Sequence, residues 1–245
     1  MSAQVLIVTS GKGGVGKSSL SVMLGLALAS LGKKVLLLEM DSGLRSLDIM
    51  LGVSDRAVYD LSDILYGRCR PVQAITRTAH SNLHLILAPL RPDMPYTAEG
   101  FAKVCRGLST VYDYLIAETP AGFGAAFDAA ARAADSALLV VTPDRICVRD
   151  ARVVSDYLDE KGLTRQRLLI NRVGRQSMGR LKTVPDLDFV IDQVGEPLLG
   201  VIPEDPDAAG CLARGAAPGE GLPAAAACRN VARRLGGEYV ELSVQ

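Results

Sequence analysis

Eight residues near the N-terminus have the types and spacing of a loop that binds phosphate groups. Residues 11–18 read Gly-Lys-Gly-Gly-Val-Gly-Lys-Ser and match the pattern G-x-x-x-x-G-K-[ST] in full. Glycines let such a loop turn sharply and point backbone N–H groups at phosphate oxygens, while Lys17 reaches the outer phosphates and the Ser18 hydroxyl ligates Mg²⁺. The candidate phosphate-binding residues are Gly11, Gly13, Gly14, Val15, Gly16, Lys17, Ser18 and Ser19.

The segments on either side of this loop are those that phosphate binding requires. Residues 5–8 are all apolar and predict a short strand, and residues 17–31 carry apolar residues with a helical period and end at Gly32. A helix that begins at the loop adds the positive end of its dipole to the site. A glycine-rich turn that matches the pattern by chance is the alternative, and the strand–loop–helix order argues against it.

The rest of the chain alternates between short apolar runs and helix-like segments. Strands are expected at residues 5–8, 34–38, 83–87, 114–117, 137–141, 168–170 and 198–202, and helices at 17–31, 125–134, 148–160 and 224–235. Continuous apolar runs are typical of strands buried on both faces, so we predict an α/β fold: a doubly wound, mostly parallel sheet of about seven or eight strands flanked by helices. We expect one domain over residues 1–245, with a loop and then a helix within 213–227 and a short tail at 236–245.

Composition excludes several classes of protein. Of 245 residues, 49% are apolar and 22% charged, which is a globular composition. The 27 basic residues balance the 27 acidic ones, so nucleic acid is not an expected partner. The five cysteines are scattered without a C-x-x-C pair, and the chain has neither a signal peptide nor an apolar run of membrane-spanning length. We therefore expect reduced cysteines and a cytoplasmic location.

A lysine at the second position of the loop narrows the choice of family. With Lys12, the sequence GKGGVGKS resembles the deviant Walker A motif of the MinD and ParA family of ATPases. The resemblance implies that the chain binds ATP or ADP with Mg²⁺ and hydrolyses ATP. It also implies that Lys12 crosses a dimer interface to the partner's nucleotide, so Lys12 and Lys17 are both candidate catalytic residues.

Residues 39–48 resemble the switch I segment of the MinD members, Asp-x-Asp-x-Gly-Leu-Arg-Asn-Leu-Asp. The agreeing residues are Asp41, Gly43, Leu44, Arg45, Leu47 and Asp48. The resemblance implies that Asp41 positions the attacking water and lies near the metal, a role that suits a carboxylate beside a γ-phosphate. Glu39 and Ser46 stand where the family has aspartate and asparagine.

Residues 112–122 are similar to the family's Walker B strand and switch II. The family's acidic residue there is aspartate, and this chain has Glu118. A glutamate reaches one methylene further and could enter the Mg²⁺ shell, so the candidate metal ligands are Ser18, Asp41 and Glu118. The alternative is an acid at a strand end with no metal role.

Three later segments resemble parts of the same family. Residues 142–150 correspond to a helix start near dimer and partner contacts, where Arg149 and Asp150 are either partner-binding residues or a local charge pair. The resemblance assigns recognition of adenine to the neighbourhood of Asn171 and Arg172 and to the segment from Pro203 to Asp205. For each of these two, a polar loop at a strand end is the alternative.

The C-terminal residues differ from the basic amphipathic helix that attaches MinD proteins to membranes. Residues 238–245 contain two glutamates, no lysine and no arginine, and their apolar residues alternate with a strand period. We therefore do not expect this segment to bind membrane: the tether is lost, the sequence is truncated before it, or a partner supplies the attachment at the inner face of the membrane.

Three functional hypotheses remain open from the sequence. The first is a MinD-like ATP-dependent homodimer in division-site placement, with a MinC- or MinE-like protein or another division regulator as partner. The second is a ParA-like or flagellar-number ATPase. The third is a nucleotide-binding scaffold with little turnover, which the replacements Glu39 and Glu118 motivate.

Overall fold

The computed structural model describes residues 3–91, 96–174 and 184–242. Its strands form one sheet in the order β3-β4-β2-β5-β1-β6-β7-β8. The bounds are β1 (Gln4–Thr9), β2 (Val35–Glu39), β3 (Thr76–Arg77), β4 (Leu83–Ile86), β5 (Tyr114–Glu118), β6 (Ser136–Val141), β7 (Gln166–Val173) and β8 (Leu198–Pro203). All neighbouring strands pair in parallel except β3 and β4, which are antiparallel.

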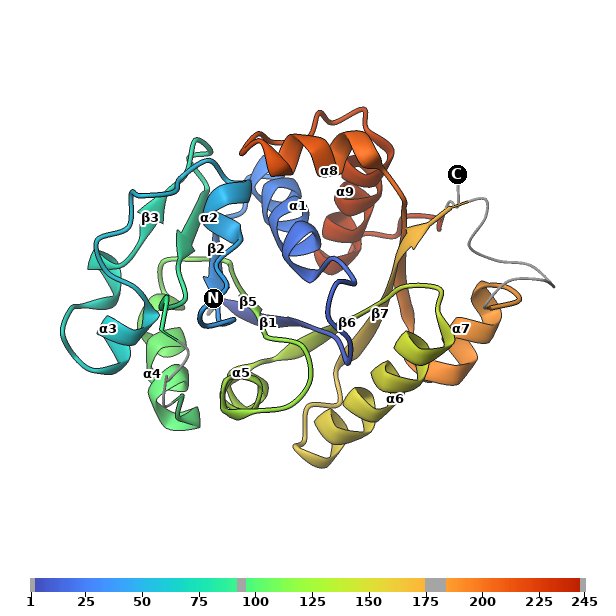
Figure 1. Ribbon diagram of the computed structural model, residues 1–245, viewed down its shortest axis with the longest axis horizontal. Coiled ribbons are helices and arrows are strands. Elements are labelled where there is room, and N and C mark those ends of the chain that lie inside the picture. The colour runs from blue at the N-terminus through green and yellow to red at the C-terminus, as the bar shows by residue number, and fades with distance from the viewer. Residues whose placement is uncertain (1–2, 92–95, 175–183, 243–245) are drawn as a thin grey trace.

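Helices cover both faces of the sheet. The bounds are α1 (Lys17–Ser30), α2 (Leu47–Met50), α3 (Leu61–Leu65), α4 (Ala98–Leu108), α5 (Ala125–Ala133), α6 (Arg145–Glu160), α7 (Leu187–Val194), α8 (Pro206–Ala213) and α9 (Pro223–Leu235), with a 3₁₀ turn η1 (Pro71–Gln73). In Figure 1, α1, α2, α8 and α9 lie on one face and α4, α5, α6 and α7 on the other. The predicted doubly wound α/β fold is confirmed.

Burial explains why the strands were visible in the sequence. Every residue of β2, β5 and β6 is buried, because helices cover both sides of these central strands. The seven predicted strands are all present, and a loop followed by α9 lies where residues 213–227 predicted it. Each of the five cysteines lies within the described residues and is a free thiol.

The structure adds elements that the sequence reading left out. They are β3 and the helices α2, α3, α4, α7 and α8. Residues 238–242 form neither helix nor strand, and residues 243–245 lie outside the described part. Among the described residues, no helix has the length and apolar character that a bilayer span requires.

The topology decides where a site can form. The predicted site residues lie at or after the ends of six strands, namely β1, β2, β5, β6, β7 and β8. These strands run parallel, so their carboxyl ends meet at one edge of the sheet. Ligands of open α/β sheets bind at this edge. The sequence-predicted site residues lie in the last residues of these strands, in the loops that follow them, or in the first turn of α1.

Candidate functional site

The phosphate-binding loop connects β1 to α1 at the centre of the sheet. Gly14 and Gly16 have positive φ angles of 77° and 94°, which L-residues with side chains rarely adopt. Gly16 is the N-cap of α1, so no side chain caps the first N–H groups of this helix. A Cβ atom built on Gly13 or Gly14 meets no heavy atom within 4 Å. The loop therefore presents open space and backbone donors to an anion.

Lys17 lies inside the site and not on its surface. Its side chain is buried, and its Nζ donates a hydrogen bond to the Ser10 hydroxyl at 3.1 Å. Burial lowers the pKa of Lys17, and the nearby carboxylates of Glu118 and Asp41 act in the opposite direction. A buried lysine that bonds a hydroxyl and lies within reach of the charges of two carboxylates is placed to neutralise the charge of a bound phosphate chain.

Ser18 and Glu118 come together although 100 residues separate them in the sequence. The Ser18 hydroxyl donates to Oε1 of Glu118, while Oε2 of Glu118 is buried and has no hydrogen-bond partner among the described residues. Burial raises the pKa of Glu118 to about 7. A hydroxyl and a carboxylate with one unused buried oxygen are hard oxygen donors of the kind that Mg²⁺ prefers, so these residues fit the metal that the sequence motif implies.

Asp41 follows β2 on the other side of the site, in the switch loop, which we define as residues 40–46. Asp41 is partly buried, and burial raises its pKa whereas Lys17 lowers it. Two contacts fix the loop near this residue: Gly43 N donates to Pro89 O at 2.9 Å, and Arg45 bonds Asp60 at 3.3 Å. The structure therefore brings Asp41, Lys17, Ser18 and Glu118 to one region.

Lys12 lies on the exposed side of the loop and pairs with a residue of its own chain. Its Nζ lies 3.2 Å from Oδ1 of Asp144, and the two side chains are 44% and 35% exposed. Asp144 is also the N-cap of α6, accepting from Cys147 N at 3.0 Å. Hydrogen bonding from Cys147 N, and next the bond from Lys12, lowers the pKa of Asp144.

The second turn of α6 also touches the phosphate loop. A Cβ atom on Gly11 would lie 2.6 Å from Cβ of Asp150, so glycine is required there. Asp150 also accepts a hydrogen bond from Arg149 at 2.8 Å. Arg149 and Asp150 therefore form the local charge pair that was one of the two interpretations of these residues from the sequence.

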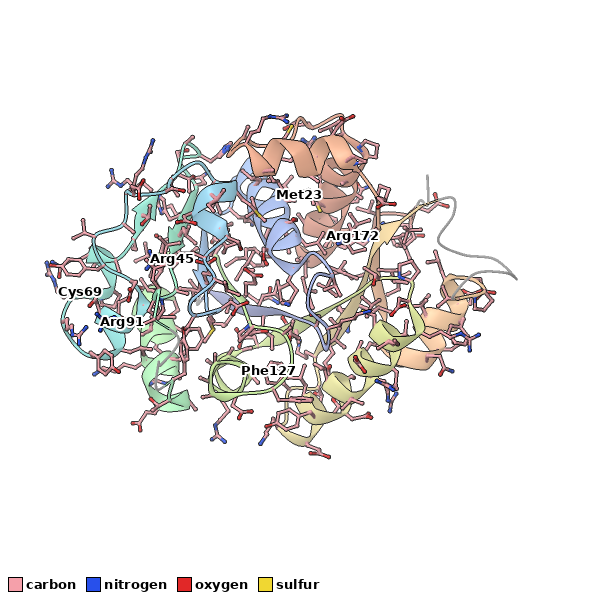
Figure 2. The ribbon with its side chains drawn as sticks, in the orientation of Figure 1. Met23, Arg45, Cys69, Arg91, Phe127 and Arg172 are labelled. Atoms are coloured by element: carbon pink, nitrogen blue, oxygen red, sulfur yellow. The ribbon has the colours of Figure 1, made fainter. Side chains whose placement is uncertain are left out.

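The residues predicted to lie near adenine occupy the ends of β7 and β8. Asn171 is buried and donates from Nδ2 to Val15 O at 2.7 Å, so it braces the phosphate loop from β7. Arg172 has φ 56° at an irregularity of the pairing between β7 and β8. In Figure 2, Arg172 and Arg45 lie on opposite sides of α1.

Asp205 has a structural contact that the sequence did not indicate. Its Oδ1 accepts from Ala208 N at 2.9 Å and caps α8, and its Oδ2 accepts from Ala224 N at 3.0 Å in α9. Pro203 ends β8 and pairs with Val173 of β7. Asp205 therefore fixes the two helices that follow β8.

Three polar residues of the site were not among the candidates from the sequence. Ser10 accepts from Lys17, Asp144 holds Lys12, and Glu39 binds the switch loop. Glu39 and Ser10 lie at strand ends next to motif residues, which is a usable signal. The contact of Asp144 spans 132 residues, and nothing local in the sequence indicates it.

Comparison with known proteins identifies the family. Residues 6–218 match the model of the CobQ/CobB/MinD/ParA nucleotide-binding domain. The septum site-determining protein MinD of Bacillus subtilis is 36% identical over 251 residues, covering 98% of this chain and 92% of that protein. The chain belongs to the MinD family.

Solved structures of MinD-family proteins share its fold. The Aquifex aeolicus MinD cell division protein superposes with a TM-score of 0.89 at 34% identity, covering 99% of this chain and 100% of that one. A MinC:MinD complex from the same organism gives 0.91 at 35% identity and covers 99% of each chain. Pyrococcus horikoshii MinD, solved with Mg-ADP, gives 0.84 at 28% identity, covering 95% of this chain and 96% of that one.

The MinD-family relatives define the function at family level. This chain is a MinD-like protein of division-site placement, with the P-loop of an ATP-binding family that includes ATPases.

Proposed function

We propose that this chain hydrolyses ATP with Mg²⁺ and that ATP controls its assembly into a homodimer during division-site placement. The observation that carries the proposal is the meeting of Lys17, Ser18, Glu118 and Asp41 at the carboxyl edge of the sheet, beside a loop of backbone donors. The Mg-ADP complex of the Pyrococcus relative supports the choice of nucleotide and metal.

Each residue has a role that follows from its position. The loop amides and Lys17 hold the phosphate chain, and Ser18 and Glu118 would hold Mg²⁺, which supplies positive charge to the phosphates. Asp41 orients a water molecule toward the γ-phosphorus. The water oxygen forms a bond to that phosphorus as the bond to the bridging β–γ oxygen breaks, giving ADP and inorganic phosphate.

The homodimer part of the proposal involves Lys12. This side chain is partly exposed and its ion pair with Asp144 is a surface contact, so little free energy is needed to release it toward a second chain. The MinC:MinD complex of the Aquifex relative supports a MinC-like partner for the assembled form.

Two variants test hydrolysis. Asp41→Ala should bind ATP with nearly unchanged affinity and release phosphate about 100-fold more slowly, since it loses positioning and keeps the loop. Lys17→Ala should lose both binding and turnover. Phosphate release and calorimetry with Mg²⁺ present provide the measurements. Equal turnover by wild type and Asp41→Ala would contradict the role given to Asp41.

Sedimentation tests assembly. Wild type should double its mass with a non-hydrolysable ATP analogue and remain one chain with ADP, and Lys12→Ala should not double. A wild type that binds ATP but releases no phosphate, alone or with a MinC-like protein, would instead support the scaffold with little turnover. That second candidate is motivated by Glu118, which is buried and is one methylene longer than the aspartate of the family motif.

A further inference from the structure

Glu39 is a buried carboxyl group at the edge of the site that none of the roles above uses. It is the last residue of β2 and is fully buried. Parallel pairing of β2 with β5 places it in register with Glu118. Burial raises the pKa of Glu39, and its Oε2 has no hydrogen-bond partner in the described part of the chain. Burying such a group is unfavourable unless its remaining contacts offset the loss of water.

The other oxygen of Glu39 makes two hydrogen bonds to the far end of the switch loop. Oε1 accepts from Ser46 N at 2.7 Å and from Leu47 N at 3.1 Å. These N–H groups begin α2, whose own N-cap residue, Ser46, makes no side-chain capping bond. A residue of the sheet therefore supplies the cap of this helix.

Five other helices in the described part of the chain are capped locally. The helices α3, α4, α6, α7 and α8 are each capped by a side chain at their own N-cap, namely Asp60, Thr97, Asp144, Asp186 and Asp205. Such local caps suffice to satisfy the first amides of a helix. Capping from β2 does something more, because it joins the two ends of the loop that lies between.

The switch loop leaves β2 at Glu39 and returns to the side chain of the same residue. Asp41 lies within this closed loop and faces Lys17 closely enough for their charges to interact. Tyr96 supports the same loop from outside, since its hydroxyl bonds the Ser42 hydroxyl at 3.0 Å and donates to Met40 O at 3.3 Å. The two bonds from Ser46 and Leu47 to Glu39 are called the Glu39 clasp below.

We propose that Glu39 is a positioning residue for ATP hydrolysis: the Glu39 clasp holds the switch loop closed on β2, so that Asp41 stays directed at the phosphate site. This proposal rests on the proposed ATPase function. Ser46 takes part through its backbone N–H, so the Glu39 clasp does not depend on the side chain at position 46.

Hydrogen exchange of the nucleotide-free protein tests the clasp without reference to activity. In wild type, the amides of Ser46 and Leu47 should be protected. Glu39→Ala removes the acceptor and should speed their exchange about tenfold or more, and Glu39→Asp should do the same because its carboxyl group is one methylene shorter. Glu39→Gln keeps an acceptor oxygen at the same reach and should retain protection.

Asp186→Ala provides a matched control. It removes the cap of α7, where Asp186 accepts from Phe189 N at 2.8 Å. This helix connects β7 to β8, which lie at the opposite end of the strand order from β2. This variant should exchange faster only at the start of α7. Unchanged protection of Ser46 and Leu47 in both Glu39→Ala and Glu39→Asp would overturn the clasp.

Kinetics separates positioning from folding. Glu39→Ala and Glu39→Asp should reduce kcat about tenfold or more with KM nearly unchanged, and Glu39→Gln should restore most of kcat. If Glu39→Ala fails to fold, the difference in kcat between Glu39→Asp and Glu39→Gln still tests the positioning role. Loss of protection with unchanged kcat would overturn the positioning role alone. If wild type itself shows no turnover, the proposed function fails, while the exchange result still decides whether the clasp exists.

Discussion

At the scale of single residues, the phosphate loop combines positions that tolerate a side chain with positions that do not. Gly11 packs against Asp150 of α6, and Gly13 faces open space. The motif G-x-x-x-x-G-K-[ST] fixes glycine at position 11 and leaves position 13 open, and the structure gives a steric reason for Gly11 but not for Gly13.

Substitution of these two glycines tests that difference. Gly11→Ala should destabilise the nucleotide-free protein by about 1–3 kcal/mol, because its Cβ would lie 2.6 Å from Cβ and from the backbone oxygen of Asp150. Gly13→Ala should leave the stability of the nucleotide-free protein nearly unchanged. Denaturant unfolding without nucleotide provides the comparison, and equal losses in both variants would contradict the contact.

The pair of Lys12 and Asp144 makes a prediction about assembly. Asp144→Asn keeps an oxygen to cap Cys147 N and removes the charge that holds Lys12. The ATP concentration needed for dimerisation should therefore fall by up to about fivefold, the effect expected of an exposed ion pair. Asp156→Asn, which breaks the exposed pair of Arg152 and Asp156 on the same helix, is the control and should not change assembly in sedimentation.

At the scale of elements, the sequence indicated the strands and helices that have a clear local pattern. It missed very short elements and contacts between residues far apart in the chain. The strand, loop and helix from residue 4 to residue 30 follow from contiguous residues and were predicted with nearly correct bounds. β3 has two residues and offers no pattern to detect. The helix α4 was detectable, since Phe101, Val104, Cys105 and Leu108 are buried at helical spacing after the cap Thr97.

The candidate site shows the same division. Lys17 and Ser18 were predictable because their motif is contiguous. The contact of Asn171 with Val15 spans 156 residues and depends on the strand order, so its bracing role could not be derived from local pattern. The Glu39 clasp spans seven residues, but its detection needs the direction in which the chain turns after β2.

The strand β4, next to the edge of the sheet, also carries a pH-sensitive contact. Burial, and next the charge of Arg77, lowers the pKa of His84 on β4, whose Nδ1 lies 2.8 Å from the Tyr112 hydroxyl. A histidine with a depressed pKa stabilises the fold above its unfolded pKa, and this contribution is lost as the pH falls through the folded pKa. The melting temperature should fall below about pH 6.5, and less steeply in His84→Asn; parallel profiles would contradict this role.

At the scale of the whole molecule, ligand binding should be visible as stability. ATP with Mg²⁺ at 100 times its Kd should add about 2.7 kcal/mol. For a chain of this size, that corresponds to a rise in melting temperature of about 5–10 °C. Lys17→Ala should show little or no rise, whereas Asp41→Ala should respond as wild type does. A shift of equal size in Lys17→Ala would place nucleotide binding elsewhere.

The switch loop carries an exposed apolar side chain: Leu44 is 76% exposed, two residues before the Glu39 clasp closes. The chain contains no tryptophan. An indole introduced by Leu44→Trp would therefore be the sole fluorophore of its kind in the molecule. Its emission would follow the hydration of this loop in real time, so the same solution could show nucleotide arrival, pairing of two chains and release of phosphate as separate optical phases.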